Sequence, residues 1–115
     1  MRSDEDFKKA RWWFFDKFTE KNYRAFKKRY PRGSQAYRYF MDFVAYWELL
    51  STLVLHGVLS EDLVFDMFPF QFLWMRAEPV VLGMREDMKT PRLFENFEVL
   101  GKKVVEWEKT HPPKV

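Results

Sequence analysis

The chain has 115 residues, of which 47% are hydrophobic and 32% charged, and its net charge is +3 at pH 7. These values fit one globular domain and exclude both a disordered chain and an integral membrane protein. The absence of cysteine excludes disulfides, thiolate metal sites and cysteine nucleophiles. Aromatic residues make up 20% of the chain, which predicts a core rich in large rings.

The first predicted helix begins at Ser3, whose hydroxyl suits an N-cap. The acidic residues 4–6 that follow favour the positive end of the helix dipole. The helical pattern continues toward Tyr30 and ends at the Pro-Arg-Gly sequence of residues 31–33. Thr19 offers a second N-cap, which leaves a break inside this helix as an alternative.

Residues 35–56 form the second predicted helix, with Ser34 as its N-cap. Gly57 follows at the position where a left-handed residue ends a helix. Apolar side chains lie on more than one face of this helix, and a helix that is apolar nearly all round lies at the centre of a bundle.

Ser60 caps the next predicted helix, which Pro69 interrupts because proline lacks a backbone donor and clashes with the preceding turn. A further helical stretch covers residues 69–87, and Pro79 inside it predicts a kink. The last helix restarts at Thr90, an N-cap followed directly by proline.

Gly101 lies inside this last predicted helix, where glycine costs about 1 kcal/mol relative to alanine. Its presence there indicates a close crossing with another helix. Glu98 and Lys102, four residues apart, are expected to form a surface ion pair.

Together these segments predict an all-α fold, an antiparallel bundle of four to five helices with a proline-kinked third or fourth segment. We expect a single helical domain over residues 1–115. Its parts are a basic and aromatic N-terminal region at 1–33, a core bundle at 34–110 and a frayed tail at 111–115.

No arrangement of residues in the sequence predicts catalysis. His56 lies at a helix C-terminus and His111 in the tail, and neither stands in the context of a catalytic triad. The sequence also lacks the zinc-protease, calcium-loop, Walker and dinucleotide-binding motifs. We therefore expect a protein that is not an enzyme and that has no metal, no cofactor and no small-molecule substrate.

Glu48 lies in the middle of the most apolar predicted helix. A buried carboxylate needs a charged partner or takes up a proton. Arg85 and Arg76 are the candidate partners, so we expect a structural buried ion pair. A catalytic carboxylate would need a second acid or base beside it, and the sequence indicates none.

Basic residues are concentrated in residues 1–40, whereas acidic residues outnumber them in the remainder. The densest basic run comprises Lys21, Arg24, Lys27, Lys28, Arg29 and Arg32. Aromatic residues are interleaved with this run, and such a combination binds nucleic-acid backbones and stacks on bases. The other interpretation is a solvated helix face whose side-chain stems cover apolar surface.

Three segments, at residues 39–50, 55–68 and 91–100, carry a family resemblance. They contain an apolar helix with a central glutamate, a Gly-Val-Leu-Ser-Glu-Asp-Leu-Val turn and a closing Pro-Arg-Leu-Phe sequence. This pattern resembles domain-of-unknown-function family 4760, a set of small helical bacterial and phage-associated domains, over about residues 35–107. The matching positions are Glu48, Gly57, Trp74, Arg85 and Glu98.

Pro69 departs from the family pattern, which more often has glycine or a polar residue there. The resemblance implies a helical fold and no assigned activity. It also favours Arg85 over Arg76 as the partner of Glu48.

Four consecutive aromatic residues, 12–15, give the functional prediction. Four adjacent residues on a helix span all of its faces, so at least one ring points to solvent or to a partner, unless long neighbouring side chains cover it. Because an exposed tryptophan is a typical interface anchor, we expect Trp12, Trp13 and Phe15 to bind another protein or a second copy of the chain. The alternatives are a small nucleic-acid-binding or regulatory protein that uses the basic run, and peripheral membrane attachment by the first helix.

The start of the chain, residues 1–6, is polar and acidic, which predicts no signal peptide. The longest apolar stretch, residues 43–59, carries Glu48 and His56 and is too polar for stable membrane insertion. We therefore expect a cytoplasmic protein.

Overall fold

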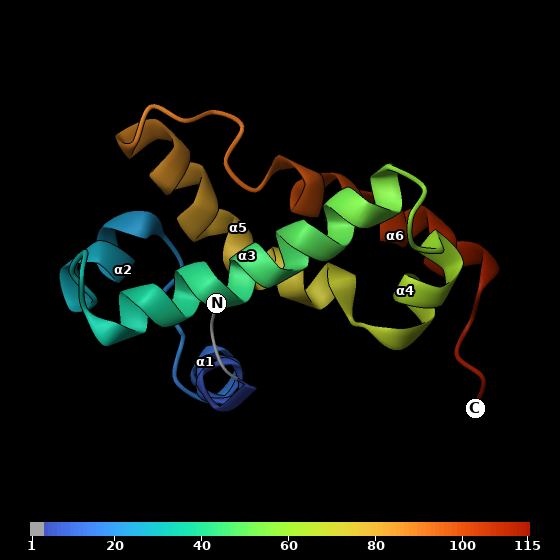
Figure 1. Ribbon diagram of the computed structural model, residues 1–115, viewed down its shortest axis with the longest axis horizontal. Helices are drawn as coiled ribbons and strands as arrows, with labels where there is room; N and C mark the ends of the chain where they lie inside the picture. Colours follow the sequence, from blue (N-terminus) through green and yellow to red (C-terminus); the bar gives the residue numbers. More distant parts are fainter. Residues whose placement is uncertain (1–3) are drawn as a thin grey trace.

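The computed structural model describes residues 4–115 and, within that range, contains six helices and no strand (Figure 1). The helices are α1 (Asp4–Asp16), α2 (Tyr23–Arg29), α3 (Gln35–Leu55), α4 (Glu61–Met67), α5 (Phe70–Asp87) and α6 (Glu95–Thr110). The all-α class is therefore confirmed, with six helices in place of the expected four to five. None of the helices in residues 4–115 combines the length and the apolar composition needed to cross a membrane.

The first predicted helix is two helices in the structure. The chain turns after α1 at Phe18, whose ring is buried. Asn22 then caps α2, because its side-chain oxygen accepts a backbone N–H of the first turn at 2.8 Å. The predicted break is present, but the cap that restarts the helix is Asn22 and not Thr19. The predicted cap at Ser3 lies outside the described residues.

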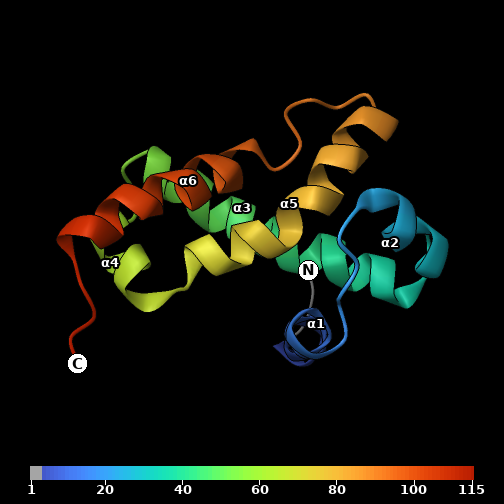
Figure 2. The ribbon, with the colours of Figure 1, turned by 180° about the vertical axis from the view of Figure 1, so that it is seen from behind.

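The central position predicted for residues 35–56 is confirmed by the packing of α3. This helix crosses the molecule and packs against α1, α4 and α6 (Figures 1 and 2). The Ser34 hydroxyl accepts the N–H of Tyr37 at its start, and Gly57 has a φ of +78° just after its end. Both predicted ends of the helix are therefore correct.

α5 packs against α2 on one side and α6 on the other (Figure 2). Ser60 caps α4, and Pro69 stands directly before the first residue of α5, while Pro79 lies inside it. The start predicted for the last helix at Thr90 is wrong, because the Thr90 hydroxyl donates to the carbonyl oxygen of Met88 instead of capping. α6 begins only at Glu95.

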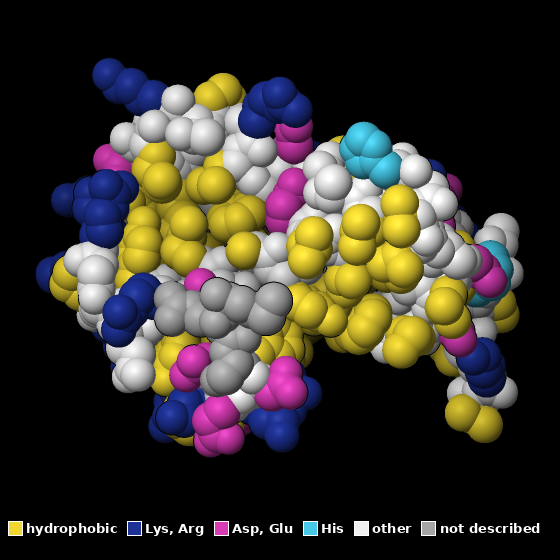
Figure 3. All heavy atoms as spheres, viewed as in Figure 1, with side chains coloured by type: hydrophobic (Ala, Val, Ile, Leu, Met, Phe, Trp, Pro, Cys, Tyr) yellow, Lys and Arg dark blue, Asp and Glu magenta, His cyan; other side chains and the backbone are white. Residues whose placement is uncertain are grey.

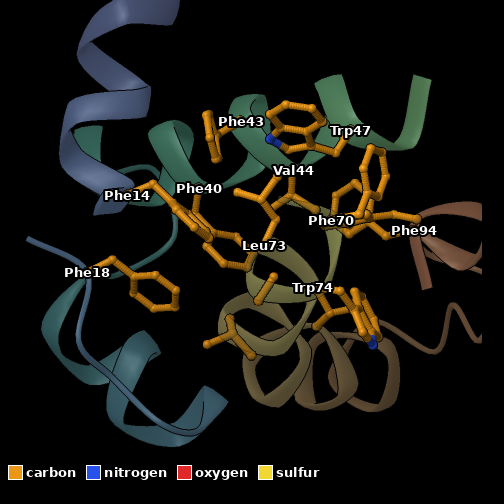
Figure 4. Close-up of a cluster of buried hydrophobic side chains, with 14 of the residues drawn as sticks. Phe14, Phe18, Phe40, Phe43, Val44, Trp47, Phe70, Leu73, Trp74 and Phe94 are labelled. Carbon is orange, nitrogen blue, oxygen red and sulfur yellow. The ribbon is translucent and has the colours of Figure 1, made fainter. Parts of the chain in front are cut away.

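The core is built largely from aromatic rings of α1, α2, α3, α5 and α6, as the composition predicts. Figure 4 shows part of this cluster, including Phe14 of α1, Phe43 of α3 and Phe70 of α5. Those that are almost fully inaccessible to solvent are Phe14, Phe26, Phe40, Phe43, Phe70 and Phe97. Ring pairs such as Phe14 and Phe43, with centroids 4.7 Å apart, connect α1 to α3.

Two glycines allow helices to approach closely. A Cβ atom at Gly101 would lie 2.4 Å from the Cβ of Trp74, so the lack of a side chain on α6 lets α5 pack against it. A Cβ atom at Gly83 would lie 2.2 Å from the Cβ of Tyr23, which gives α2 the same access to α5. The close crossing expected from Gly101 is thereby confirmed.

Residues 111–115 follow α6 without regular secondary structure. The Lys114 ammonium lies 2.9 Å from a carboxylate oxygen of Asp66 in α4. The His111 ring stacks on Trp107, with centroids 4.1 Å apart. The segment predicted as a frayed tail therefore has contacts with α4 and α6.

Candidate interaction surface

The four consecutive aromatic residues of α1 divide evenly between the core and the surface. Trp12 and Phe15 are 52% and 47% exposed, whereas Trp13 and Phe14 are 5% and 2% exposed. Trp13 stacks on Phe18 with centroids 5.4 Å apart, at the point where the chain leaves α1. Trp13 is thus a core residue in this structure, and of the three candidate anchors only Trp12 and Phe15 are accessible.

An apolar surface continues from α1 onto α5. The rings of Phe15 and Phe72 stack with centroids 5.8 Å apart and planes 3° from parallel. Phe72 and Met75 are both exposed and lie three residues apart, so they share a face of α5, as Trp12 and Phe15 share a face of α1. We name this set, Trp12, Phe15, Phe72 and Met75, the aromatic surface.

One charged side chain lies over the aromatic surface. The Lys17 ammonium lies 5.3 Å from the centroid of the Trp12 ring, which is within the range of a cation–π contact. Because Lys17 and the ring are both exposed, this contact covers the indole only in part. The ring therefore keeps area that a partner can bury.

A cleft of about 330 Å³ adjoins the aromatic surface at Phe15. Figure 3 shows the surface indented between the part that contains α1, at the bottom, and the part that contains α4, at the right, with hydrophobic side chains along the indentation. We name it the α1–α3 cleft, and its walls are Phe7, Arg11, Phe15, Phe43, Tyr46, Trp47, Phe68, Pro69 and Leu73. No sequence pattern indicated it, because its walls come from three separate segments.

Glu48 has a different role from the one predicted. One of its carboxylate oxygens accepts the backbone N–H of Phe97 at 2.8 Å, in the first turn of α6. α6 lacks a cap of its own, because Phe94, at the cap position, has a left-handed φ of +57° and no capping side chain. Glu48 therefore caps α6 from α3. Burial raises the pKa of this carboxyl, although hydrogen bonds from Phe97 and Asn96 oppose the effect.

The predicted partners of Glu48 bind elsewhere. The Arg85 guanidinium forms an ion pair with Glu98 at 2.6 Å, and its Nε donates to the carbonyl oxygen of Leu93. Arg76 donates to the carbonyl oxygen of Phe18. Burial raises the pKa of Glu98, but hydrogen bonds from Lys102 and Arg85 outweigh it, so the pKa is lowered overall. The expected pair of Glu98 and Lys102 is present at 2.6 Å.

The basic run lies on and beside α2, and all six of its side chains are exposed. Two of them have acidic partners: Lys27 lies 3.2 Å from Asp87, and Arg29 lies 3.0 Å from Glu20. Hydrogen bonds from Tyr23 and Lys27 lower the pKa of Asp87. Those without an ion-pair partner in residues 4–115 are Lys21, Arg24, Lys28 and Arg32.

The titratable residues of the described part of the chain, 4–115, do not gather into a metal-binding cluster. Within residues 4–115 no three of the His, Asp and Glu side chains lie close enough together to hold a metal ion. His56 occupies the C-cap position of α3, as its place in the sequence indicates. The His111 Nε2 atom lies 3.3 Å from a carboxylate oxygen of Asp62.

The comparisons with known proteins give one match. The model of the family described as "Domain of unknown function (DUF4760)" matches residues 1–104. No curated protein and no solved structure matches the chain. The family match begins well before residue 35, so it includes α1 and α2 as well as the segments that carry the sequence resemblance.

Proposed function

This chain belongs to the family described as domain of unknown function DUF4760, and from that premise we propose that it is a non-enzymatic interaction module. It binds another protein, a second copy of the chain included, through the aromatic surface. The observation that supports this is the exposure of Trp12 and Phe15 beside two buried neighbours. The proposal keeps the cytoplasmic location expected from the sequence.

The free-energy cost of leaving large apolar rings in water favours a binding role for Trp12, Phe15 and Phe72. Apolar area that is removed from water contributes about 25 cal/mol per Å². Tryptophan and other large rings near the centre of an interface dominate binding energies. The stacked pair of Phe15 and Phe72 adds a flat apolar area next to Trp12, spanning two helices that are themselves anchored in the core.

Alanine substitutions in α1 distinguish exposed rings from buried rings by their effect on stability. Trp12→Ala is expected to change the free energy of unfolding by no more than about 0.5 kcal/mol, because an exposed ring contributes little to the fold. Trp13→Ala is expected to lower it by about 3–5 kcal/mol, because it leaves a cavity among Phe18, Phe26 and Tyr30. Urea unfolding of both variants checks this. Equal losses of unfolding free energy in the two variants would contradict the assignment of Trp12 to the surface and Trp13 to the core.

Sedimentation velocity over a range of concentrations tests self-association first. We expect the wild type to form a dimer as its concentration rises and Trp12→Ala to stay a monomer under the same conditions. The control is Val58→Ala, which removes an exposed apolar side chain far along the chain from α1 and is expected to behave as the wild type. A dimer unaffected by Trp12→Ala would show that the aromatic surface is not the site of self-association.

A second candidate function is nucleic-acid binding by the basic run. The supporting observation is that Lys21, Arg24, Lys28 and Arg32 are exposed without an ion-pair partner in the described residues. If these residues bind phosphates, affinity for single-stranded DNA falls steeply with added salt. Lys28→Gln is expected to make that dependence shallower by about one unit of slope in a plot of log affinity against log salt. Filter binding at several salt concentrations measures it, and an unchanged slope would remove the candidate.

A further inference from the structure

The α1–α3 cleft has the size and walls of a small-molecule site. Its volume of about 330 Å³ is at the lower end of the range that such sites occupy, and its walls are mostly aromatic. The rings come from α1, from α3 and from the junction of α4 and α5. Phe43 and Leu73 form the floor, since both are fully buried. An occupant must therefore be small and largely apolar.

Trp47 contributes an unused hydrogen-bond donor to the cleft wall. Its side chain is 6% exposed, and its Nε1 atom is buried without a partner in residues 4–115. Figure 4 shows the nitrogen on the edge of the indole that faces Phe43, another residue of the wall. A buried N–H without an acceptor costs about 1–3 kcal/mol. Among the described side chains of the wall, the Tyr46 hydroxyl can accept a hydrogen bond, but it forms none with Nε1, so an occupant with an oxygen atom can supply the missing acceptor.

Arg11 adds a positive charge to the same cleft. It lies on α1 four residues after Phe7 and four before Phe15, so it faces the cleft between the two rings. Its guanidinium has no ion-pair partner in the described residues, and no acidic side chain lines the cleft. Guanidinium groups bind carboxylates through two parallel hydrogen bonds.

We propose that the α1–α3 cleft binds a small amphipathic carboxylic acid. The apolar chain or ring of the ligand packs among Phe7, Phe43 and Leu73, and its carboxylate binds Arg11 and accepts the N–H of Trp47. This inference does not depend on the proposed protein partner, because its test uses the purified chain and a small molecule.

The test is a ligand titration of the isotope-labelled full chain, monitored by proton–nitrogen correlation spectra. Each of the five tryptophans gives one indole signal in these spectra. The probes are octanoate, octanol and octylammonium, which share one chain and differ in charge. Trp47→Phe assigns the Trp47 signal. We expect octanoate to shift that signal until it saturates, and to bind more tightly than octanol. Octylammonium is expected to bind most weakly.

Arg11→Gln is expected to weaken octanoate binding at least about tenfold, because it removes the charge-assisted hydrogen bonds to the carboxylate, and to leave octanol binding unchanged. Lys9→Gln is the control, because it removes a positive charge from α1 outside the cleft. Octanol that binds as tightly as octanoate, or equal octanoate affinities for the wild type and Arg11→Gln, would overturn the carboxylate assignment. No saturable shift of the Trp47 signal with any probe would overturn the site itself.

Discussion

Gly101→Ala is expected to lower the free energy of unfolding by about 2 kcal/mol, although alanine is the better helix former. The gain in helix propensity is about 1 kcal/mol. The opposing effect is steric, because the new Cβ atom would lie 2.4 Å from the Cβ of Trp74. The Trp74 Cβ is bonded directly to the backbone of α5 and cannot move without it. The clash therefore separates α5 from α6 instead of moving a flexible side chain.

Urea unfolding of Gly101→Ala and Val99→Ala measures the effect. Val99 lies on the exposed side of α6, so Val99→Ala reports helix propensity without a clash and is expected to be neutral or slightly stabilising. A Gly101→Ala variant as stable as the wild type would mean that α5 and α6 do not pack as closely as Trp74 requires.

Glu48→Ala is the second substitution with a large expected effect. It removes the carboxylate that accepts the Phe97 N–H, and Phe97 is buried, so this donor is left without a partner. The expected loss is about 1–3 kcal/mol in the free energy of unfolding. Glu48→Gln keeps an oxygen at the same position and is expected to lose no more than about 1 kcal/mol. Equal losses in the two variants would contradict the capping role.

The raised pKa of Glu48 predicts a pH dependence with a definite sign. A carboxyl whose pKa is raised in the folded state binds protons more readily there than in the unfolded state. The stability of the wild type relative to Glu48→Gln should therefore increase as the pH falls through the folded-state pKa toward its ordinary value. Unfolding of both proteins at about pH 7 and about pH 5 checks this, and contributions from Glu98 cancel because both proteins contain it.

The parts of the fold that depend on local signals were predictable. The side chains that cap α3 and α4, Ser34 and Ser60, bond within three residues along the chain, and Gly57 ends α3 by its own backbone conformation. The all-helical class follows from the same local patterns. Gly101 also gave a correct tertiary prediction, since an unfavourable residue inside a helix needs a packing reason.

The start of α6 was not predictable from neighbouring residues. Its cap comes from Glu48, which is 49 residues away in the sequence. The apolar surroundings of Glu48 in the sequence indicate that it needs a partner, and a carboxylate on an apolar helix favours the prediction of an ion pair with a cation. The backbone N–H groups of a helix N-terminus satisfy the same need, and only the packing of α3 against α6 reveals them.

The candidate site was predictable only in outline. Four consecutive rings on α1 indicate that some are exposed, but which ones depends on where α2 and α3 pack. Trp13 is covered by Phe26 of α2 and by Tyr30 at its C-cap, in a segment that the sequence pattern joins to the first helix unless the chain breaks near Thr19. Phe72 and the α1–α3 cleft require contacts between distant segments, for which the sequence carries no local pattern.

Affinity capture from native lysate, with and without nuclease treatment, tests the central claim most directly. The baits are the tagged wild type, Trp12→Ala and the control Val58→Ala, and retained proteins are identified by mass spectrometry. We predict a protein that the wild type and Val58→Ala retain and that Trp12→Ala loses. Identical sets of retained proteins for all three baits, or material that disappears with nuclease, would contradict a protein-binding role for the aromatic surface.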